Sequence, residues 1–251
     1  MNLEQKRTYV QENINLVPEE QLRLFNFNFD CVLTKNSCCM EGPDIVSIED
    51  VVSIIRGYHV RTDEMLKRSI YNHYKAFQMV RDEIEKNNEL TEDFVKDLHE
   101  VLVDGLCEGG LYRNTNLRIN GSGYIPCDYV KVYDRMKKYF LNVTSPFDII
   151  TSARGTYSTD LEKVAYAHLE FSKIHPLLDG NGRLARLILN YVLMAKGFVP
   201  IVIRAKNKEE YFNCLEAYKV DKNPQPFMDL LNQLLNAEYD RIIELIDRHK
   251  K

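Results

Sequence analysis

The sequence lacks any long uncharged apolar run, so it predicts no helix that could cross a membrane. Its N-terminal stretch, MNLEQKRTYVQENINL, carries too many charged residues to act as a signal peptide. We therefore expect a cytoplasmic protein without a membrane partner.

An excess of positive charge is absent as well. The chain has 33 lysines and arginines against 37 aspartates and glutamates, which gives a formal net charge of -4. Such a chain has no overall basic field to attract nucleic acid or an anionic membrane surface. Any anion site must therefore be local, and we expect no nucleic-acid partner.

Cysteine spacing typical of a zinc site is absent, because no CxxC or Cys/His ligand pattern occurs in the sequence. We interpret the six cysteines as reduced thiols, mostly packed as small apolar side chains. They are Cys31, Cys38, Cys39, Cys107, Cys127 and Cys214.

Repeats, low-complexity tracts and Pro/Gly/Ser-rich linkers are also missing. The 251 residues, 45% of them hydrophobic, therefore predict one compact unit. Apolar residues recur at helical spacing along most of the chain, so the predicted fold class is all-α. The predicted helical stretches cover residues 51–55, 65–84, 94–106, 130–141, 161–174, 184–194, 211–218 and 227–246.

One stretch, LYRNTNLRINGSGYIPCDYV, departs from the helical pattern. Leu117 and Ile119 alternate with polar neighbours ahead of Gly121, which predicts a short β-hairpin that ends at Pro126. A lone hairpin in a helical protein is either a connector or a working part. This stretch alone leaves both interpretations open.

The most polar loop of the chain lies in FSKIHPLLDGNGRLARLILN, ahead of a predicted helix. Glycines let successive backbone N–H groups converge on an anion, and the helix N-terminus behind them adds partial positive charge. Arg183 and Arg186 are three residues apart, so both planar guanidinium groups lie near one face of the first helical turn. The loop therefore predicts a phosphate site.

Two further side chains of this loop suggest chemistry. Asp179 would repel phosphate unless a cation neutralised it, and Mg²⁺ prefers one or two carboxylates together with phosphate oxygens and water. Pro176 forces the chain out of the preceding helix and leaves the His175 imidazole at the loop mouth. There His175 could accept a proton from a hydroxyl that attacks a phosphate.

These residues resemble a known family. The string HPLLDGNGRLAR is similar to the Fic-domain signature H-x-F-x-[DE]-G-N-G-R-x-x-R at every fixed position except Leu177, where phenylalanine is usual. Leucine should keep this anchor under the loop buried. GLYRNTNLRINGSGYIP also resembles the flap of the family, and KNKEEYFNCLEAY resembles the helix that follows the active site. The resemblance covers roughly residues 90–227.

The resemblance implies a Fic-type helical core with a short β-hairpin flap over residues 90–251. Residues 1–89 would form a helical N-terminal segment packed on that core. Proteins of this family typically transfer AMP from ATP to a Ser, Thr or Tyr hydroxyl of a target protein, with Mg²⁺. The chain would then be a nucleotidyltransferase whose partners are ATP and a protein target.

The resemblance also implies residue roles. His175 would be the general base, Asp179 the Mg²⁺ ligand, and Tyr211 part of the adenine pocket. The residues that would hold the nucleotide phosphates are Gly180, Asn181, Gly182, Arg183 and Arg186. An extended target segment would pair with the flap edge, which consists of Leu117, Arg118, Ile119, Asn120 and Gly121.

A second motif lies far ahead of the loop. SCCMEG resembles the inhibitory signature of the family, [ST]-x-x-x-E-[GN], through Ser37, Glu41 and Gly42. Glu41 would pair with Arg186 and block the γ-phosphate of ATP. Cys38 and Cys39 would lie inside this inhibitory helix, where we expect them to pack.

Three functions remain open from the sequence. The leading interpretation is an autoinhibited protein adenylyltransferase, with its own chain left open as a further target. The second is removal of AMP from a modified protein, with Glu41 positioning water. The third is a nucleotide-sensing interaction module with little turnover. The sequence leaves a homo-oligomer open.

Overall fold

The structure is a computed structural model that describes residues 1–40, 46–119, 121–144, 150–152, 155–157 and 159–250. Helices dominate it, which confirms the predicted fold class. The α-helices are α1 (Leu3–Asn13), α2 (Glu19–Cys38), α3 (Ile48–Ile55), α4 (Glu64–Glu85), α5 (Glu92–Val103), α6 (Val132–Val143), α7 (Asp160–Ile174), α8 (Asn181–Ala195), α9 (Lys208–Asp221) and α10 (Gln225–Asp247). Short 3₁₀ turns lie at Ile14–Leu16, Tyr129–Lys131 and Ala205–Asn207.

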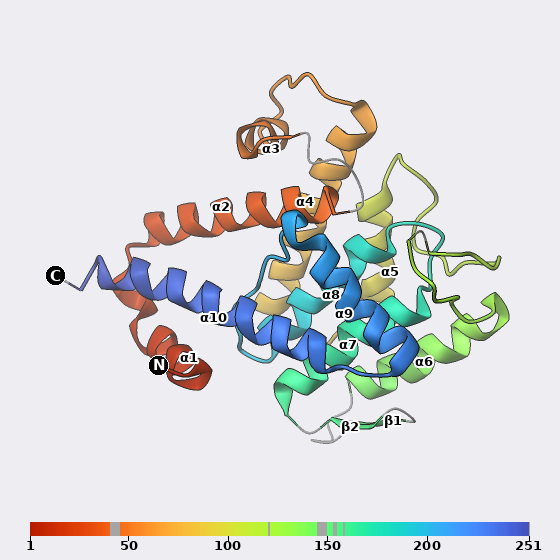
Figure 1. The fold of residues 1–251 in the computed structure, drawn as a ribbon. Helices are drawn as coiled ribbons and strands as arrows, with labels where there is room; N and C mark the ends of the chain where they lie inside the picture. The colour runs from red at the N-terminus through yellow and green to blue at the C-terminus, as the bar shows by residue number, and fades with distance from the viewer. Residues whose placement is uncertain (41–45, 120, 145–149, 153–154, 158, 251) are drawn as a thin grey trace.

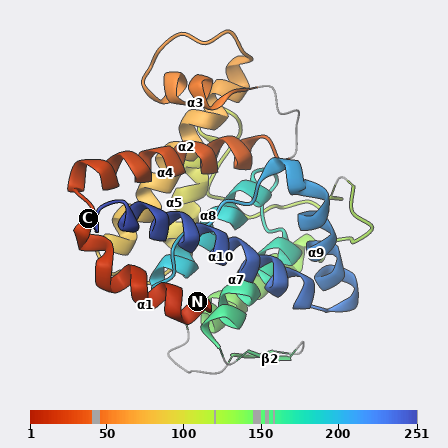
Figure 2. The ribbon, with the colours of Figure 1, turned by 60° about the vertical axis from the view of Figure 1, so that its left-hand side comes forward.

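Helices α7 and α8 form the centre of the molecule and pack against each other. Every residue of α8 from Leu184 to Leu193 is buried, so this helix is surrounded by others. Helices α2, α4 and α5 also contact α8, while α6, α9 and α10 contact α7. Both views place α3 at one end of the molecule (Figure 1 and Figure 2).

Local signals in the sequence account for the ends of the two central helices. Thr159 accepts a hydrogen bond from the Glu162 N–H, and the Glu162 carboxylate accepts one from the Thr159 N–H. This capping box starts α7. Gly197 follows α8 with a φ of 73°, a left-handed conformation that glycine adopts without strain.

The N-terminal helices α1 and α2 were not predicted from apolar spacing. Helix α1 buries only Lys6 and Val10, so its sequence shows no apolar stripe. Its principal contact is with α10, where the Lys6 ammonium lies 2.7 Å from an Asp240 carboxylate oxygen. Within α2, Asp30 is buried among apolar side chains and pairs with Arg81 of α4 at 2.6 Å. Charged groups at buried positions hide the periodicity of both helices.

The predicted flap hairpin is wrong. The described residues between Leu111 and Asp128 contain no strand, and Asn120 lies outside the described residues. A two-stranded antiparallel sheet occurs instead in β1 (Ile150–Ser152) and β2 (Gly155–Tyr157), with Thr151 opposite Thr156. Side chains of other elements hold the flap segment, as described below, so its backbone needs no ladder partner.

The structure also agrees with the absence of a long apolar run. No helix in the described ranges has the length and apolar character that a membrane crossing requires.

Candidate active site

The loop between α7 and α8 starts at a residue in an unusual conformation. His175 ends α7 with φ 51° and ψ 62°, in the left-handed region that non-glycine residues rarely adopt. Its N–H donates to the Phe171 carbonyl at 3.0 Å, which closes the last turn of the helix. Pro176 follows, as the sequence predicted, and the chain leaves the helix there.

The far end of the loop is the start of α8. Gly180 precedes the helix with a φ of 73°, and its carbonyl accepts the first helical hydrogen bond from the Leu184 N–H at 2.9 Å. The N–H groups of Asn181, Gly182 and Arg183 therefore have no acceptor inside the helix. They form the helix N-terminus that an anion would meet.

Asn181 closes the loop with its side chain. Its Oδ1 accepts from the Leu177 N–H at 2.9 Å, and its Nδ2 donates to the Leu177 carbonyl at 2.8 Å. Leu177 itself is 2% exposed, so leucine fills the anchor position below the loop. The Asn181 amide group therefore holds the shape of the loop through its oxygen and one of its two Nδ2 hydrogens.

His99 of α5 supports the loop from below. Its Nδ1 accepts a hydrogen bond from the Gly110 N–H at 3.0 Å, so the ring proton must lie on Nε2. Nε2 then donates to the Asp179 carbonyl at 3.1 Å. Glycine is required at position 180 for two reasons. Its φ is left-handed, and a Cβ atom there would lie 3.3 Å from His99 Nε2. Burial lowers the pKa of His99, so the ring stays neutral.

Arg113 connects the loop to the flap segment. It is buried, and its Nε donates to the His175 carbonyl at 2.9 Å. Its other guanidinium nitrogens donate to the carbonyls of Thr115 at 3.0 Å and Cys127 at 2.6 Å. Its backbone N–H donates to the Pro176 carbonyl at 2.8 Å. One arginine thus fixes both ends of the flap against the residue proposed as the base.

The tip of the flap is held by α9. Glu216 accepts hydrogen bonds from the Ser122 hydroxyl at 2.6 Å and from the Gly123 N–H at 3.0 Å. The ammonium of Lys173 lies 5.2 Å from the centre of the Tyr124 ring. Among the predicted docking residues, Arg118 and Gly121 are exposed, and Leu117 and Ile119 are half-buried. The described part of the flap is therefore open to solvent along one edge while its tip is fixed.

His175 is a neutral base in this environment. Burial is the main reason that its pKa falls from 6.5 to about 4, and the positive charges of Lys219 and Arg113 contribute. A hydrogen bond with the Ser172 backbone and the negative charge of Asp179 act in the opposite direction. An imidazole that is unprotonated near neutral pH can accept a proton.

Asp179 has the exposure that a metal ligand needs. Its side chain is 62% exposed, and one carboxylate oxygen lies 3.3 Å from an Arg183 nitrogen. No group of three or more His, Cys, Asp or Glu side chains in the described part of the chain could hold a metal by itself. One carboxylate still suits Mg²⁺, because this ion is commonly bound by one carboxylate together with substrate phosphates.

The two arginines of the loop meet the N-terminal helices. Arg183 donates to the Ser69 hydroxyl of α4 at 2.8 Å. Arg186 is buried, and it donates to the Ser37 hydroxyl and to the Ser37 carbonyl, both at 2.9 Å. The structure therefore joins the SCCMEG motif to the loop through Ser37, while Glu41 and Gly42 lie outside the described residues.

The prediction that Cys39 lies inside the inhibitory helix is wrong by one residue. Helix α2 ends at Cys38, and Cys39 is its C-terminal cap residue. Both cysteines pack in the cluster of side chains between α2, α3 and α4, which agrees with the predicted packing role.

Comparison with known proteins identifies the central part of this arrangement. Residues 89–193, which contain α5 to most of α8, match the model of the Fic/DOC family. This part of the chain is similar to a Fic domain.

Relatives of the Fic domain have been named for an activity. The chain is 29% identical over 134 residues to "Protein adenylyltransferase Fic" of Nematostella vectensis. The aligned segment covers 53% of this chain and 29% of the relative. It is 26% identical over 160 residues to "Protein adenylyltransferase fic-1" of Caenorhabditis elegans. That aligned segment covers 63% of this chain and 30% of the relative. The matched segments thus span less than a third of these relatives.

The fold similarity reaches beyond the matched residues. A Fic domain containing signaling protein from Bacteroides thetaiotaomicron superposes with a TM-score of 0.80 over 98% of this chain and 95% of its own, at 21% identity. Residues 134–508 of C. elegans Fic-1 superpose with a TM-score of 0.79 over 98% of this chain and 71% of that one, at 18% identity. The N-terminal helices therefore belong to the shared fold.

One predicted site residue lies in the core. Tyr211 is 1% exposed, and its hydroxyl lies 3.0 Å from Nε2 of His168. The other ring nitrogen of His168 lies 3.0 Å from the Ala185 carbonyl and must donate to it, so Nε2 accepts from the tyrosine. The ring joins α9 to the α7–α8 pair, and contact with adenine would require this core to open.

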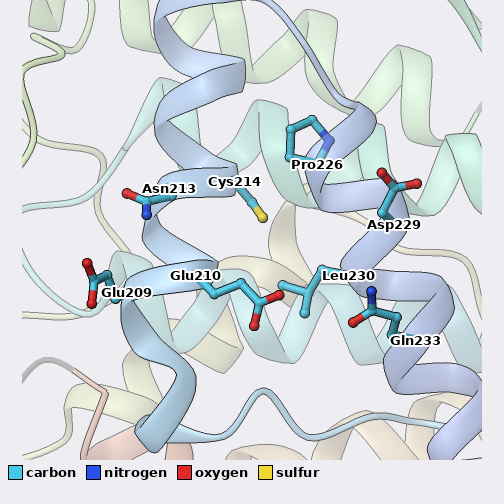
Figure 3. Close-up of a pocket in the computed structure, with 8 residues that line it drawn as sticks. All are labelled: Glu209, Glu210, Asn213, Cys214, Pro226, Asp229, Leu230 and Gln233. Carbon is cyan, nitrogen blue, oxygen red and sulfur yellow. The ribbon is translucent and has the colours of Figure 1, made fainter.

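A cavity of about 580 Å³ lies between α9 and α10, away from the loop (Figure 3). Figure 3 shows Cys214 and Leu230 between the two helices and Asp229 and Gln233 along α10. None of the residues that line it belongs to the loop or the flap. We assign it no part in the site.

Two residues that organise the Fic site were missed from the sequence. His99 lies on the apolar face of α5 with Val95 and Leu102, and a histidine on such a face requires partners for its ring nitrogens. That placement is a usable signal. Arg113 gives none, because only the folded chain brings together the three carbonyls that its guanidinium group reaches.

Proposed function

We propose that this protein is an adenylyltransferase that transfers AMP from ATP to a hydroxyl group of a target protein. The observation that carries the proposal is a neutral His175 beside an open helix N-terminus and two arginines, within a region similar to a Fic domain. The relatives named as protein adenylyltransferases support it.

The proposed reaction uses the loop as follows. Backbone N–H groups at the start of α8 bind the phosphate chain, and Arg183 and Arg186 hold its outer phosphates. His175 removes the proton from the target hydroxyl, whose oxygen then attacks the α-phosphorus. The bond between the α-phosphorus and the bridging oxygen breaks, and pyrophosphate leaves with that oxygen. Mg²⁺, held by Asp179 and phosphate oxygens, would neutralise charge on the phosphates.

The target would dock on the flap. An extended segment can pair with the backbone of the flap edge at Leu117–Ile119 without demanding a particular side-chain sequence. The fixed tip at Glu216 and the fixed base at Arg113 support this idea, since a rigid edge positions the hydroxyl toward His175.

Isotope position distinguishes the transferred group. The protein would be incubated with Mg²⁺ and ATP labelled at the α- or the γ-phosphate, and labelled peptides would be located by mass spectrometry. We expect the α-label to be incorporated as AMP and the γ-label to be released. His175→Ala should lower transfer by about 10²–10⁴-fold, while ATP affinity is retained. His59→Ala is the matched control, because His59 is exposed and lies outside the site. Incorporation of the γ-label, or of no label in both wild type and Glu41→Gly, would contradict the proposal.

We also propose that SCCMEG inhibits this reaction. The buried contact between Arg186 and Ser37 supports the idea, because it brings the end of α2 onto a residue expected to hold ATP. Glu41 would add a carboxylate to the same arginine. Glu41→Gly should therefore raise labelling, Arg186→Ala should not, and the double variant should behave like Arg186→Ala. Equal labelling by wild type and Glu41→Gly would remove the motif from regulation.

A further inference from the structure

Helix α6 has a second apolar side that the fold leaves in solvent. Its inner side is apolar and buried, and consists of Val132, Met136, Tyr139 and Phe140. On the outer side, Val130 is 64% exposed, Tyr133 60% and Leu141 66%. Single exposed apolar side chains are common on soluble proteins, whereas a contiguous group of them marks an interaction site. The arrangement of these three residues therefore decides their meaning.

The exposed side chains form one stripe along the helix. The 3₁₀ turn Tyr129–Lys131 runs directly into α6. Val130, Tyr133, Lys137 and Leu141 follow one another at spacings of three, four and four residues, so each lies beside the next on the helical surface. We call these four residues the outer face of α6. Three large apolar side chains and one lysine thus share a surface that no other element of the described chain covers.

The charge around the outer face indicates what it can bind. Lys137 lies within the face, and Lys131 and Lys138 are exposed beside it. Between residues 129 and 141, Asp134 is the single carboxylate, against these three lysines and Arg135. This surface is basic although the formal net charge of the whole chain is -4. It is complementary to a partner surface that combines acidic and apolar side chains.

The outer face begins where the flap ends. Asn116, which directly precedes the flap edge, accepts a hydrogen bond from the Tyr129 N–H at 2.9 Å and donates one to the Asp128 carboxylate at 3.3 Å. The exposed side chains of Ile125 and Tyr129 lead from the flap to the outer face. Figure 1 shows α6 at the margin of the molecule, next to the segment that follows α5. A protein segment bound along the flap edge would therefore meet the start of α6.

We infer that the outer face of α6 binds the target protein, through a target segment with acidic and apolar side chains next to the modified hydroxyl. The inference rests on the proposed function, because it takes the flap as the docking edge. Backbone pairing along the flap does not distinguish one target sequence from another. The outer face supplies that distinction, since its apolar side chains favour one composition and its lysines repel basic segments.

Direct peptide binding tests the inference without requiring catalysis. Three fluorescent peptides would carry the same central Ser, Thr and Tyr, flanked on both sides by Asp and Leu, by Asp and Gly, or by Lys and Leu. Anisotropy with the full chain should show that the Asp/Leu peptide binds about 10-fold more tightly than the other two. The double variant Tyr133→Ala/Leu141→Ala should lose this preference, because it truncates two anchors of the face.

A charge reversal gives a second variant that leaves the apolar side chains in place. Lys137→Glu/Lys138→Glu should weaken binding of the Asp/Leu peptide about 10-fold and strengthen binding of the Lys/Leu peptide. Tyr58→Ala is the matched apolar control, because Tyr58 is 68% exposed and follows α3 at the other end of the molecule. Lys208→Glu is the charge control, because Lys208 is exposed on α9. Circular dichroism would confirm that all variants are folded.

Transfer to the same peptides separates this inference from the proposed function. With α-labelled ATP and Glu41→Gly protein, KM for the Asp/Leu peptide should rise about 10-fold when Tyr133→Ala/Leu141→Ala is added, while ATP affinity stays unchanged. If all three peptides are labelled equally well, the inference fails alone. If the Asp/Leu peptide binds selectively and no peptide is labelled, the proposed transfer fails and the binding surface stands.

Two other occupants of the outer face would overturn the inference. Sedimentation velocity would reveal a dimer of wild type that Tyr133→Ala/Leu141→Ala converts to a monomer, and the face would then bind a second copy of this chain. Vesicles of phosphatidylcholine and phosphatidylserine would reveal membrane binding that the same variant loses. Equal affinity of wild type for the three peptides would also overturn it.

Discussion

At the scale of single residues, several side chains of the site form hydrogen bonds to the backbone and so fix the shape of the loop. Asn181 shapes the loop, His99 supports it, and Arg113 fixes it to the flap. His175 is the exception, because its ring is placed by the backbone of its own helix end and remains available for chemistry. The neutral state of this ring is the property that the proposed reaction needs most.

The protonation of His175 gives a pH prediction. Burial lowers its pKa from 6.5 to about 4, so the ring loses its proton-accepting form only as the pH falls toward about 4. We expect kcat/KM for AMP transfer to show no acid limb near the ordinary histidine pKa of 6.5. Rates would be measured over a pH series, with circular dichroism at each pH as a control for folding. A half-maximal rate near pH 6.5 in folded protein would contradict this assignment.

The signature in the sequence predicted these loop residues well and their contacts poorly. It placed His175 and Asp179 at one loop and the arginines at the start of the following helix, and these are their positions in the structure. It could not show that the Asn181 amide closes on Leu177, or that Tyr211 donates inward to His168. Those contacts depend on which neighbours the fold brings near, and spacing along the chain does not contain that information.

At the scale of elements, the flap shows why the predicted hairpin failed. Alternation in Leu117 and Ile119 predicted a strand, but a strand needs a ladder partner. Here the partners are side chains, Arg113 at the base and Glu216 at the tip. A long polar side chain that reaches a backbone group leaves no periodic trace in the sequence, so local patterns could not predict this conformation.

The contact between Glu216 and the flap predicts a separation of target and nucleotide effects. Glu216→Gln removes the charge and leaves one oxygen to accept the two hydrogen bonds, so the flap tip should loosen. We expect KM for a protein target to rise about 3-fold to 10-fold, since about 1 kcal/mol of positioning is lost. ATP affinity should not fall.

The matched control for this prediction is Glu209→Gln, an exposed carboxylate at the start of the same helix. Target peptide labelling would be followed at several peptide concentrations, and ATP binding by calorimetry. If ATP affinity fell in parallel with target labelling, Glu216 would belong to the nucleotide site instead of the flap.

At the scale of the whole molecule, four histidines resist protonation, of which His73, His99 and His168 are buried and His175 is half-buried. Burial is the largest cause of a lowered pKa for His73, His99, His168 and His175, and for His73 and His168 the value falls to about 3. The unfolded chain protonates these rings near 6.5, so below that pH the unfolded state binds more protons than the folded one. The histidines therefore stabilise the fold above pH 6.5 and progressively less below it.

This linkage predicts acid sensitivity. The free energy of unfolding should fall between about pH 7 and about pH 5.5 by about 1 kcal/mol for each of the fully buried rings of His73 and His168. Urea unfolding at a series of pH values would measure it. His59→Ala should show the same slope as wild type, because His59 is exposed. A free energy of unfolding that stays constant or rises over this range would contradict the assignment of neutral buried rings.

The contact of α1 with α10 has a consequence for the order of events during synthesis. Lys6 and its partner Asp240 are 234 residues apart in the chain. At about 5–20 residues per second, a ribosome needs about 10 to 50 s to make the second after the first. The contacts between α1 and α10 cannot form during that interval. The outer layer of the molecule can close only when α10 has been made.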